Sequence, residues 1–277
     1  MIEFQLAESG TTVPTGWTTE CKMDGTRIVA TKEGNKVKLT NRHGVEKVAQ
    51  YPEIETAIKK FSFDCVLDGE IIANDFFQLM RREKTTEPLK MRILQKTVPV
   101  QYQIFDLLSI DGRDIRNLPQ CERKRILEQN IHENKTIKIV RAEPLEILKQ
   151  KMERDEIEGF IAKNPDAPYV GRRTKDWLKF KREKNEDAWI IGYTQTDKSN
   201  RQFRALIIKL PDGSEHHLAS GLTQVLISKL YNEMSALPYR ETKDGHYLEQ
   251  PFARVEISYY PDVTTKYRFP KFLRMKD

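Results

Sequence analysis

A lysine between two acids is the first candidate for chemistry. Lys22 lies two residues after Glu20 and two before Asp24, and Gly25 and Arg27 follow. Because side chains alternate along a strand, Glu20 and Lys22 share one face, and Asp24-Gly25 then turns the chain. A lysine is a nucleophile only when neutral, and its ordinary pKa is about 10.4. Burial or nearby positive charge, from Arg27 or a bound metal, must lower that pKa, so the stretch predicts either an activated amine or a solvated lysine beside a turn.

Two further stretches add carboxylates. Asp68 and Glu70 share a strand face inside an apolar run, and Glu158-Gly159 opens a strand-like run that ends at Lys163. Buried carboxylates are costly unless a cation or a metal pairs with them, and Mg²⁺ takes carboxylate ligands. For Asp68 and Glu70 the pattern is compatible with a metal site and equally with strand-end salt bridges. Gly159 allows close approach of a ligand or of another backbone segment.

Lysines and aromatic residues gather in the middle of the chain. Trp177, Lys179 and Lys181 point to one side of a predicted strand. Two neighbouring ammonium groups repel each other unless an anion such as a triphosphate lies between them, although a solvated basic face is the simpler alternative. Phe105 lies in an apolar run, where a core position is the ordinary interpretation and stacking on a base is the functional one.

The overall charge favours a polyanionic partner. The formal net charge is +6 and the pI is about 9.0. Residues 266–276 are basic and interleaved with aromatic residues, a composition that suits phosphate or nucleic-acid contact as well as a plain basic tail. We expect nucleic acid to be the first class of partner to test.

Hydrophobic spacing predicts an α+β fold in two parts. The segment up to Trp17 is predicted to be irregular, and a charged stretch, 181–187, is predicted to link the two parts. The first part is predicted to contain strands at 28–30, 37–40, 66–73, 98–108, 159–163 and 177–181, with helices at 51–61, 121–129 and 144–154. The second is predicted to contain strands at 189–193, 203–210, 254–259 and 267–275, with one helix at 223–237. This second pattern is compatible with a small closed β-barrel of the OB type.

Composition indicates a soluble intracellular protein. The 277 residues are 38% hydrophobic and 32% charged, with neither an apolar run long enough for a membrane nor a secretory signal. Cys21, Cys65 and Cys121 match no zinc or disulfide spacing, so they are interpreted as incidental thiols in a reducing compartment.

Taken in order, these stretches resemble the motifs of ATP-dependent DNA ligases, a family of covalent nucleotidyltransferases. They are most similar to short archaeal and bacterial ligases and to the ligase modules of bacterial end-joining enzymes. The motifs are ECKMDGTR, TNRHG, LDGE, YQIFDLL, EGFIAK, WLKFK and RFPKFLR. With the similar approach segment 13–17, the resemblance covers residues 13–276. It implies a nucleotidyltransferase (adenylation) domain of antiparallel sheets and helices at residues 1–184, followed by an OB-fold domain at 185–277.

The resemblance also implies the chemistry. Lys22 would attack the α-phosphate of ATP, giving lysyl–AMP and pyrophosphate. Glu158 would bind the catalytic metal, Mg²⁺ or Mn²⁺, and Glu70 would lie at the ribose end and near the metal. The other motif residues would bind the nucleotide: Glu20 at the adenine edge, Phe105 on the base, Arg27 at the ribose, Arg42 at the nucleotide and later the DNA 5′-phosphate, Lys179 and Lys181 at the ATP phosphates, and Arg268 and Arg274 at pyrophosphate.

The expected partner is nicked or broken double-stranded DNA. The final motif ends almost at Asp277, and no DNA-binding domain precedes Lys22. We therefore expect a monomer that grips DNA through its two core domains or through an end-joining or repair partner protein, without membrane contact, in the cytoplasm and associated with the nucleoid. The 181–187 stretch would act as the hinge.

Three alternatives stay open. An mRNA-capping guanylyltransferase also uses the KxDG pattern, but WLKFK and RFPKFLR are more similar to DNA ligases. An RNA ligase or a mixed-specificity polynucleotide ligase is harder to separate by sequence. A non-catalytic nucleic-acid-binding relative is disfavoured because Lys22, Glu70, Glu158, Lys179 and Lys181 are all present.

Overall fold

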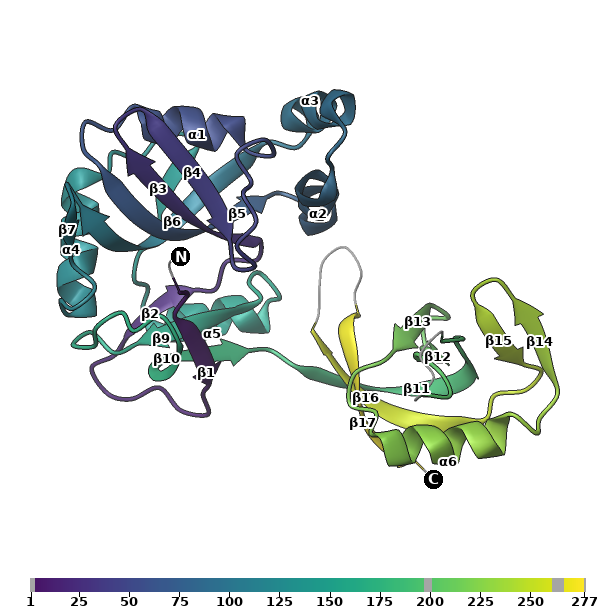
Figure 1. Ribbon diagram of the computed structural model, residues 1–277. Helices are drawn as coiled ribbons and strands as arrows, with labels where there is room; N and C mark the ends of the chain where they lie inside the picture. Colours follow the sequence, from purple (N-terminus) through teal and green to yellow (C-terminus); the bar gives the residue numbers. More distant parts are fainter. Residues whose placement is uncertain (1–2, 197–200, 261–266, 277) are drawn as a thin grey trace. The chain divides into compact units, whose positions relative to one another are not determined.

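The chain divides into two compact units. The computed structural model describes residues 3–196, 201–260 and 267–276, and its units are Met1–Lys181 and Arg182–Asp277 (Figure 1). The sequence placed the division at 184/185. Within the charged 181–187 stretch only Arg182 and Glu183 lie outside strands, because the following strand already begins at Lys184. The proposed hinge is therefore shorter than the charged stretch.

A six-stranded sheet holds the main core of the first unit (Figure 1). Its order is β4(Lys36–Asn41), β3(Thr26–Glu33), β5(Cys65–Ala73), β6(Val100–Ile110) and β7(Arg113–Asp114), with β8(Ile137–Ile139) parallel to β6. Helices α1(Pro52–Lys59) and α4(Gln120–Asn130) pack on it through buried residues such as Ile54, Ile58 and Leu127. Gly34, at a positive φ of 56°, makes the predicted turn between β3 and β4.

A four-stranded sheet forms the other part of the first unit. Its order is β1(Leu6–Ser9), β10(Arg173–Lys181), β9(Gly159–Lys163) and β2(Thr18–Cys21), and α5(Leu145–Glu153) packs nearby. The prediction that everything before Trp17 is irregular was wrong, because β1 pairs in parallel with β10. Only that distant partner makes so short a segment a strand.

Two helices between β5 and β6 escaped prediction. α2(Phe76–Lys84) begins where Asp75 caps the backbone N–H of Gln78, and α3(Pro88–Thr97) follows. Arg82, fully buried, donates to the carbonyl oxygens of Gln50 at 2.9 Å and Val98 at 2.6 Å, and to Glu53. A charged side chain thus anchors α2 to the first unit, and a pattern of apolar residues alone could not indicate this.

The second unit is a barrel of the OB type, which confirms the predicted fold class. The barrel consists of β11(Lys184–Tyr193), β12(Leu206–Lys209), β13(Glu215–Leu218), β16(Ala253–Tyr260) and β17(Arg268–Lys276), with α6(Gln224–Met234) between β13 and β16. β11 pairs with β12 and with β16, and a parallel bridge between Ser220 and Lys271 joins the two ends of the sheet. The prediction missed β13 and the hairpin β14(Tyr239–Thr242)–β15(Gly245–Leu248): β13 and β14 are mostly exposed and polar, and β15 is only four residues long, so none of them shows a clear hydrophobic pattern. Across the described ranges, every helix is too short or too polar to cross a bilayer.

Candidate active site

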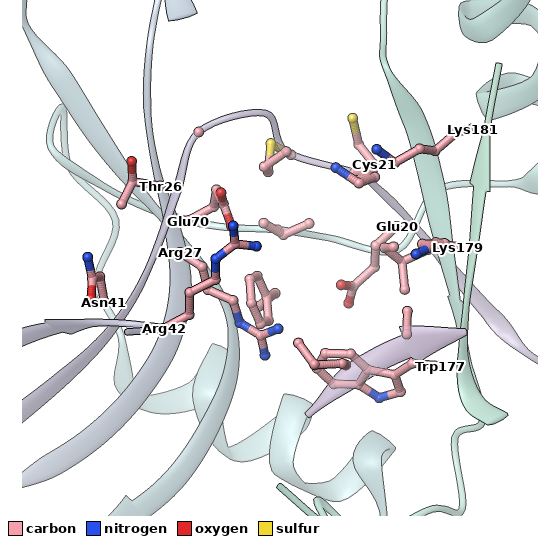
Figure 2. Close-up of a pocket in the computed structure, with 18 of the residues that line it drawn as sticks. Glu20, Cys21, Thr26, Arg27, Asn41, Arg42, Glu70, Trp177, Lys179 and Lys181 are labelled. Carbon is pink, nitrogen blue, oxygen red and sulfur yellow. The ribbon is translucent and has the colours of Figure 1, made fainter. Parts of the chain in front are cut away.

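A pocket of about 680 Å³ lies within the first unit and draws its lining from both sheets (Figure 2). Arg27, Arg42 and Glu70 lie on one side of it, while Lys179 and Lys181 lie across from them. The structure brings eight of the predicted residues to its walls. They are Glu20, Lys22, Arg27, Arg42, Glu70, Phe105, Lys179 and Lys181.

Lys22 and Lys181 share one carboxylate. Lys22 directly follows β2, and its Nζ donates to Oε2 of Glu158 at 2.5 Å, while Nζ of Lys181 lies 2.6 Å from Oε1. Burial opposes the charged form of Glu158, but the two lysines outweigh it and lower the pKa of that carboxyl. The Glu158 carboxylate is therefore the ionised group at which the ends of β2 and β10 meet the start of β9.

Two glycines allow this close packing. A Cβ on Gly25 would lie 2.0 Å from the carbonyl oxygen of Ile71, and one on Gly159 would lie 2.0 Å from that of Phe180. The backbone N–H of Lys22 also donates to the carbonyl of Gly159 at 3.0 Å. The close approach expected at Gly159 is therefore made by backbone, and it fixes Lys22 against β9.

Asp68 and Glu70 have separate environments. Asp68 is fully buried and accepts two hydrogen bonds from Arg27, at 3.0 and 2.6 Å, and one from the hydroxyl of Tyr169 at 2.8 Å. This settles the open choice for Asp68 in favour of a salt bridge. Glu70 faces the pocket, and its burial raises the pKa of its carboxyl to about 8, although Lys22 and Arg27 act in the opposite direction.

Arg27 has a structural task as well as a place in the pocket wall. It also donates to the carbonyl of Gln5 at 2.7 Å, and its guanidinium lies 5.2 Å from the centre of the Phe105 ring. Phe105 in turn packs edge-to-face on Trp177, with ring centres 5.9 Å apart. The ring therefore packs on a small core, as the ordinary interpretation expected, and it also lines the pocket, while its stacking on a base stays a prediction.

Glu20 lies at the same end of the pocket, between two lysines that the sequence did not assign. Nζ of Lys163 lies 2.6 Å from Oε2, and Nζ of Lys124 lies 2.8 Å from Oε1. Lys163 is almost fully buried, and its Nζ lies 4.5 Å from the Trp177 ring centre. Strand alternation from Ile161 could have placed Lys163 on the face of Glu20, whereas Lys124 belongs to a helix and gave no such signal.

Positive charge gathers around Lys179. Burial, together with Arg173, Lys181 and Lys22, lowers the pKa of the Lys179 ammonium. Arg173, another residue missed by sequence, lines the pocket and donates to the carbonyl of Ala7 at 2.7 Å. Arg42 is exposed in the turn after β4, where its Nε lies 3.1 Å from Nε2 of His43. An anionic ligand would reduce the mutual repulsion of Lys179, Lys181 and Arg173.

Arg268 and Arg274 belong to β17 of the second unit. Arg268 is buried, whereas Arg274 is exposed and its Nε lies 2.5 Å from Oε2 of Glu256. Their predicted role at pyrophosphate concerns the other unit and stays a prediction.

The carboxylates fit a metal that is shared with a substrate. Within residues 3–196, 201–260 and 267–276, no three acidic, histidine or cysteine side chains gather as a metal cage. Mg²⁺ commonly needs only one or two protein carboxylates beside phosphate oxygens and water. Glu158 provides such a carboxylate beside Lys22, and Glu70 would add a second one only after it loses its proton, because burial raises its pKa to about 8.

Comparison with known proteins agrees with this geometry. The family model described as "ATP dependent DNA ligase domain" matches residues 5–181. DNA ligase 1 of Methanosarcina barkeri is 29% identical over 71% of this chain and 41% of its own length, and a DNA ligase of Natronomonas pharaonis is 26% identical over 100% and 55%. The chain spans about half the length of these curated relatives.

Solved structures share the fold over the whole chain. A structure from work on Lig E DNA ligases has a TM-score of 0.71 at 16% identity and covers 100% of both chains. The ligase domain of M. tuberculosis LigD has a TM-score of 0.57 at 22% identity, covering 99% of this chain and 95% of its own. These matches confirm the resemblance that the motifs indicated.

Proposed function

Because the chain belongs to the ATP-dependent DNA ligase family, whose domain model matches residues 5–181, we propose that it seals breaks in double-stranded DNA with ATP. The substrate would carry a 5′-phosphate and a 3′-hydroxyl. The observation that supports this best is the arrangement at Glu158, which holds Lys22 beside Lys181 at the wall of a pocket large enough for a nucleotide.

The first step transfers AMP to Lys22. The neutral Nζ attacks the α-phosphorus of ATP, a nitrogen–phosphorus bond forms, the bond to pyrophosphate breaks, and the amine loses a proton. Because the lone pair must face phosphorus, the hydrogen bond from Lys22 to Glu158 has to rearrange before attack. Lys179 and Lys181 would then stabilise the negative charge on the phosphates.

Glu158 and Glu70 would hold a divalent cation, Mg²⁺ or Mn²⁺, together with the ATP phosphates. Such an ion, when bound, neutralises phosphate charge and favours departure of pyrophosphate. Glu158 is suited to this because Lys22 and Lys181 lower its pKa and keep it ionised. Ligand phosphates and the ion would replace the contacts that the lysines make with Glu158 in the structure.

The base would lie at the opposite end, against Phe105 and next to Glu20, and Arg27 with Glu70 would hold the ribose. Arg42, exposed after β4, would contact the nucleotide and then the DNA 5′-phosphate. Arg268 and Arg274 would orient pyrophosphate when the OB unit closes on the first unit, with the chain around Arg182 as the hinge between predicted domains 1–184 and 185–277.

Two DNA steps complete the reaction. A 5′-phosphate oxygen attacks the phosphorus of lysyl–AMP, which frees Lys22 and leaves AMP joined to the strand. The 3′-hydroxyl of the neighbouring strand then attacks the 5′-phosphate and releases AMP. The net charge of +6 favours DNA binding. The protein would act as a monomer in DNA repair or end joining. It would work in the cytoplasm, at the nucleoid, together with a partner protein.

Sealing of a nicked duplex tests the proposal. A labelled nicked duplex, ATP and Mg²⁺ are incubated with the wild type, Lys22→Ala and the exposed control Lys38→Ala. We expect sealing by the wild type and the control only, with Lys22→Ala still binding DNA. Nicks with ribose ends, and GTP in place of ATP, compare DNA sealing with RNA sealing and with guanylyl transfer. A wild type that seals no DNA nick would contradict the proposal.

A further inference from the structure

Glu20 has two lysine partners, and only one of them lies in the pocket wall. Figure 2 shows the Glu20 carboxylate pointing into the pocket, and Lys163 also lines it. Lys124 is not part of the lining and reaches Oε1 of Glu20 from α4 at 2.8 Å. A ligand can therefore contact Glu20 and Lys163, whereas Lys124 acts from behind the wall, through Glu20 and through Val140, whose carbonyl it also binds.

Lys124 is held firmly in this position. Its Nζ also donates to the carbonyl of Val140, and its side chain is only 12% exposed. The preceding residue, Arg123, is fully buried and makes two hydrogen bonds of 2.8 Å to Asp106, which fixes α4 against β6. The ammonium is thus placed by the fold and not by a flexible surface side chain.

The cluster presents a fixed pattern of donors and acceptors. An ionised carboxylate only accepts hydrogen bonds, and an ammonium group only donates them. Glu20 would accept from an amino group on the base, and the neighbouring Lys163 would donate to a ring nitrogen. Adenine offers an amino group at C6 beside the unprotonated N1, whereas guanine offers the O6 acceptor beside an N1–H donor. With the base placed so that Glu20 faces the C6 substituent, the pattern fits adenine, whereas guanine or hypoxanthine would have to shift so that N1–H faces Glu20 and O6 faces Lys163.

We propose that Lys124 is a positioning residue that sets the base specificity of the pocket, because it holds the Glu20 carboxylate charged and aimed as an acceptor for the adenine amino group. The inference rests on the proposed function, since it requires the pocket to bind a nucleotide. Without Lys124, Glu20 would keep a single partner, Lys163, and that lysine would be drawn toward Glu20 and away from the base.

The charges around Glu20 agree with this role. Burial opposes ionisation of Glu20, and Lys124 from α4 and Lys163 from β9 outweigh it, so the pKa of the carboxyl is lowered. Lys163 also faces the charge of Asp106 on β6. Removal of Lys124 leaves burial opposed by one lysine, so the pKa of Glu20 rises. As the pH is lowered, the variant should therefore lose nucleotide binding at a higher pH than the wild type does.

The test compares Lys124→Met, Lys124→Gln and Lys124→Arg with a matched control, Arg125→Met. Arg125 is the next residue of α4 and pairs on the surface with Glu122 and Gln129. Formation of the protein–nucleotide adduct is followed in single turnover with ATP, GTP and ITP across a pH series. ITP carries an oxygen where ATP carries the amino group.

For Lys124→Met we expect the apparent Kd for ATP to rise about tenfold, as for a lost charge-assisted contact, while the maximal rate changes little. The ratio of ATP to GTP and ITP use should fall, and the acid limb of the pH profile should move to higher pH. Lys124→Arg should restore both properties, and Arg125→Met should match the wild type. If Lys124→Met fails to fold, Lys124→Gln decides by the same readouts.

A wild-type nucleotide ratio and pH profile in the folded Lys124 variants would overturn the inference and leave the proposed function intact. An equal change in Arg125→Met would overturn it too, because the effect would then follow from the charge of α4 alone. A wild type that forms no adduct with any nucleotide would overturn the proposed function and the inference together.

Discussion

Lys22 donates a hydrogen bond of 2.5 Å to Glu158, so the proposed nucleophile and the proposed metal ligand are direct partners. Oε1 of the same carboxylate lies 2.6 Å from Nζ of Lys181. When substrate binds, these contacts must therefore be replaced. Phosphate oxygens would become the partners of the two lysines, and a divalent ion would become the partner of the carboxylate.

Glu158→Gln should slow transfer of AMP to Lys22 by about 100-fold, the loss typical when one electrostatic group is removed from a reacting site. The amide keeps the size of the side chain but loses the charge that pairs with Lys22 and Lys181. Rapid-quench measurement of adduct formation at several Mg²⁺ concentrations checks this. Glu156→Gln, on an exposed neighbour, is the control. Unchanged rates in Glu158→Gln at every concentration would remove Glu158 from the mechanism.

Asp68→Asn should destabilise the protein by about 3–5 kcal/mol, because a buried charge is left without its partner. The amide keeps one acceptor oxygen but replaces the other with an NH2 donor, so the two hydrogen bonds from Arg27 and the one from the Tyr169 hydroxyl can no longer all form, and the charge that pairs with Arg27 is lost. Denaturant unfolding measures the change. Asp114→Asn removes an exposed ion pair with Arg116 and should cost less than about 1 kcal/mol. An equal loss of unfolding free energy in the two variants would show that the buried ion pair stabilises the protein no more than the exposed one.

Glu20→Gln should destabilise the protein in a way that depends on pH. The pKa of Glu20 is lowered from 4.5 in the folded chain, so its ionised form contributes stability above that value, and the contribution is lost as pH falls through the folded pKa. The difference in unfolding free energy between wild type and variant should therefore be largest near neutrality and shrink below about 4.5. Parallel denaturation series at several pH values give this difference. A difference in unfolding free energy that grows as the pH falls would contradict a lowered pKa of Glu20.

Arg274→Ala and Arg268→Ala should separate function from stability in the OB unit. Arg274 is exposed and pairs with Glu256, so its removal should slow adduct formation with little change in thermal unfolding. Arg268 is buried, so Arg268→Ala should lower the unfolding temperature as well. Arg240→Ala, on exposed β14, controls for loss of surface charge. Adduct formation at wild-type rate in Arg274→Ala would remove that residue from the proposed pyrophosphate step.

The sequence predicted the site best where the chemistry lies on a regular strand. Alternation correctly put Trp177, Lys179 and Lys181 on one face, and all three line the pocket. It also put Lys22 at a strand end, next to Gly25, whose lack of a side chain the structure explains by the carbonyl of Ile71. Such features depend on local geometry, so a single chain is enough to indicate them.

Features that depend on distant contacts could not be predicted. Lys124 meets Glu20 only because α4 packs on β6 and reaches across to β2, and β1 is a strand only because β10 lies next to it. Asp68 looked equally suited to a metal and to a salt bridge until its bonds to Arg27 were known. The α2 helix depends on Arg82, whose buried position contradicts the usual expectation for arginine.

The most direct test is peptide mass spectrometry of protein exposed to ATP and Mg²⁺, with Lys22→Ala treated in parallel. The account predicts one adenylyl group bonded to Nζ of Lys22, absent from the variant and removed when nicked DNA is added. An unmodified Lys22 in folded protein that binds ATP, or an adenylyl group on another residue, would contradict the account.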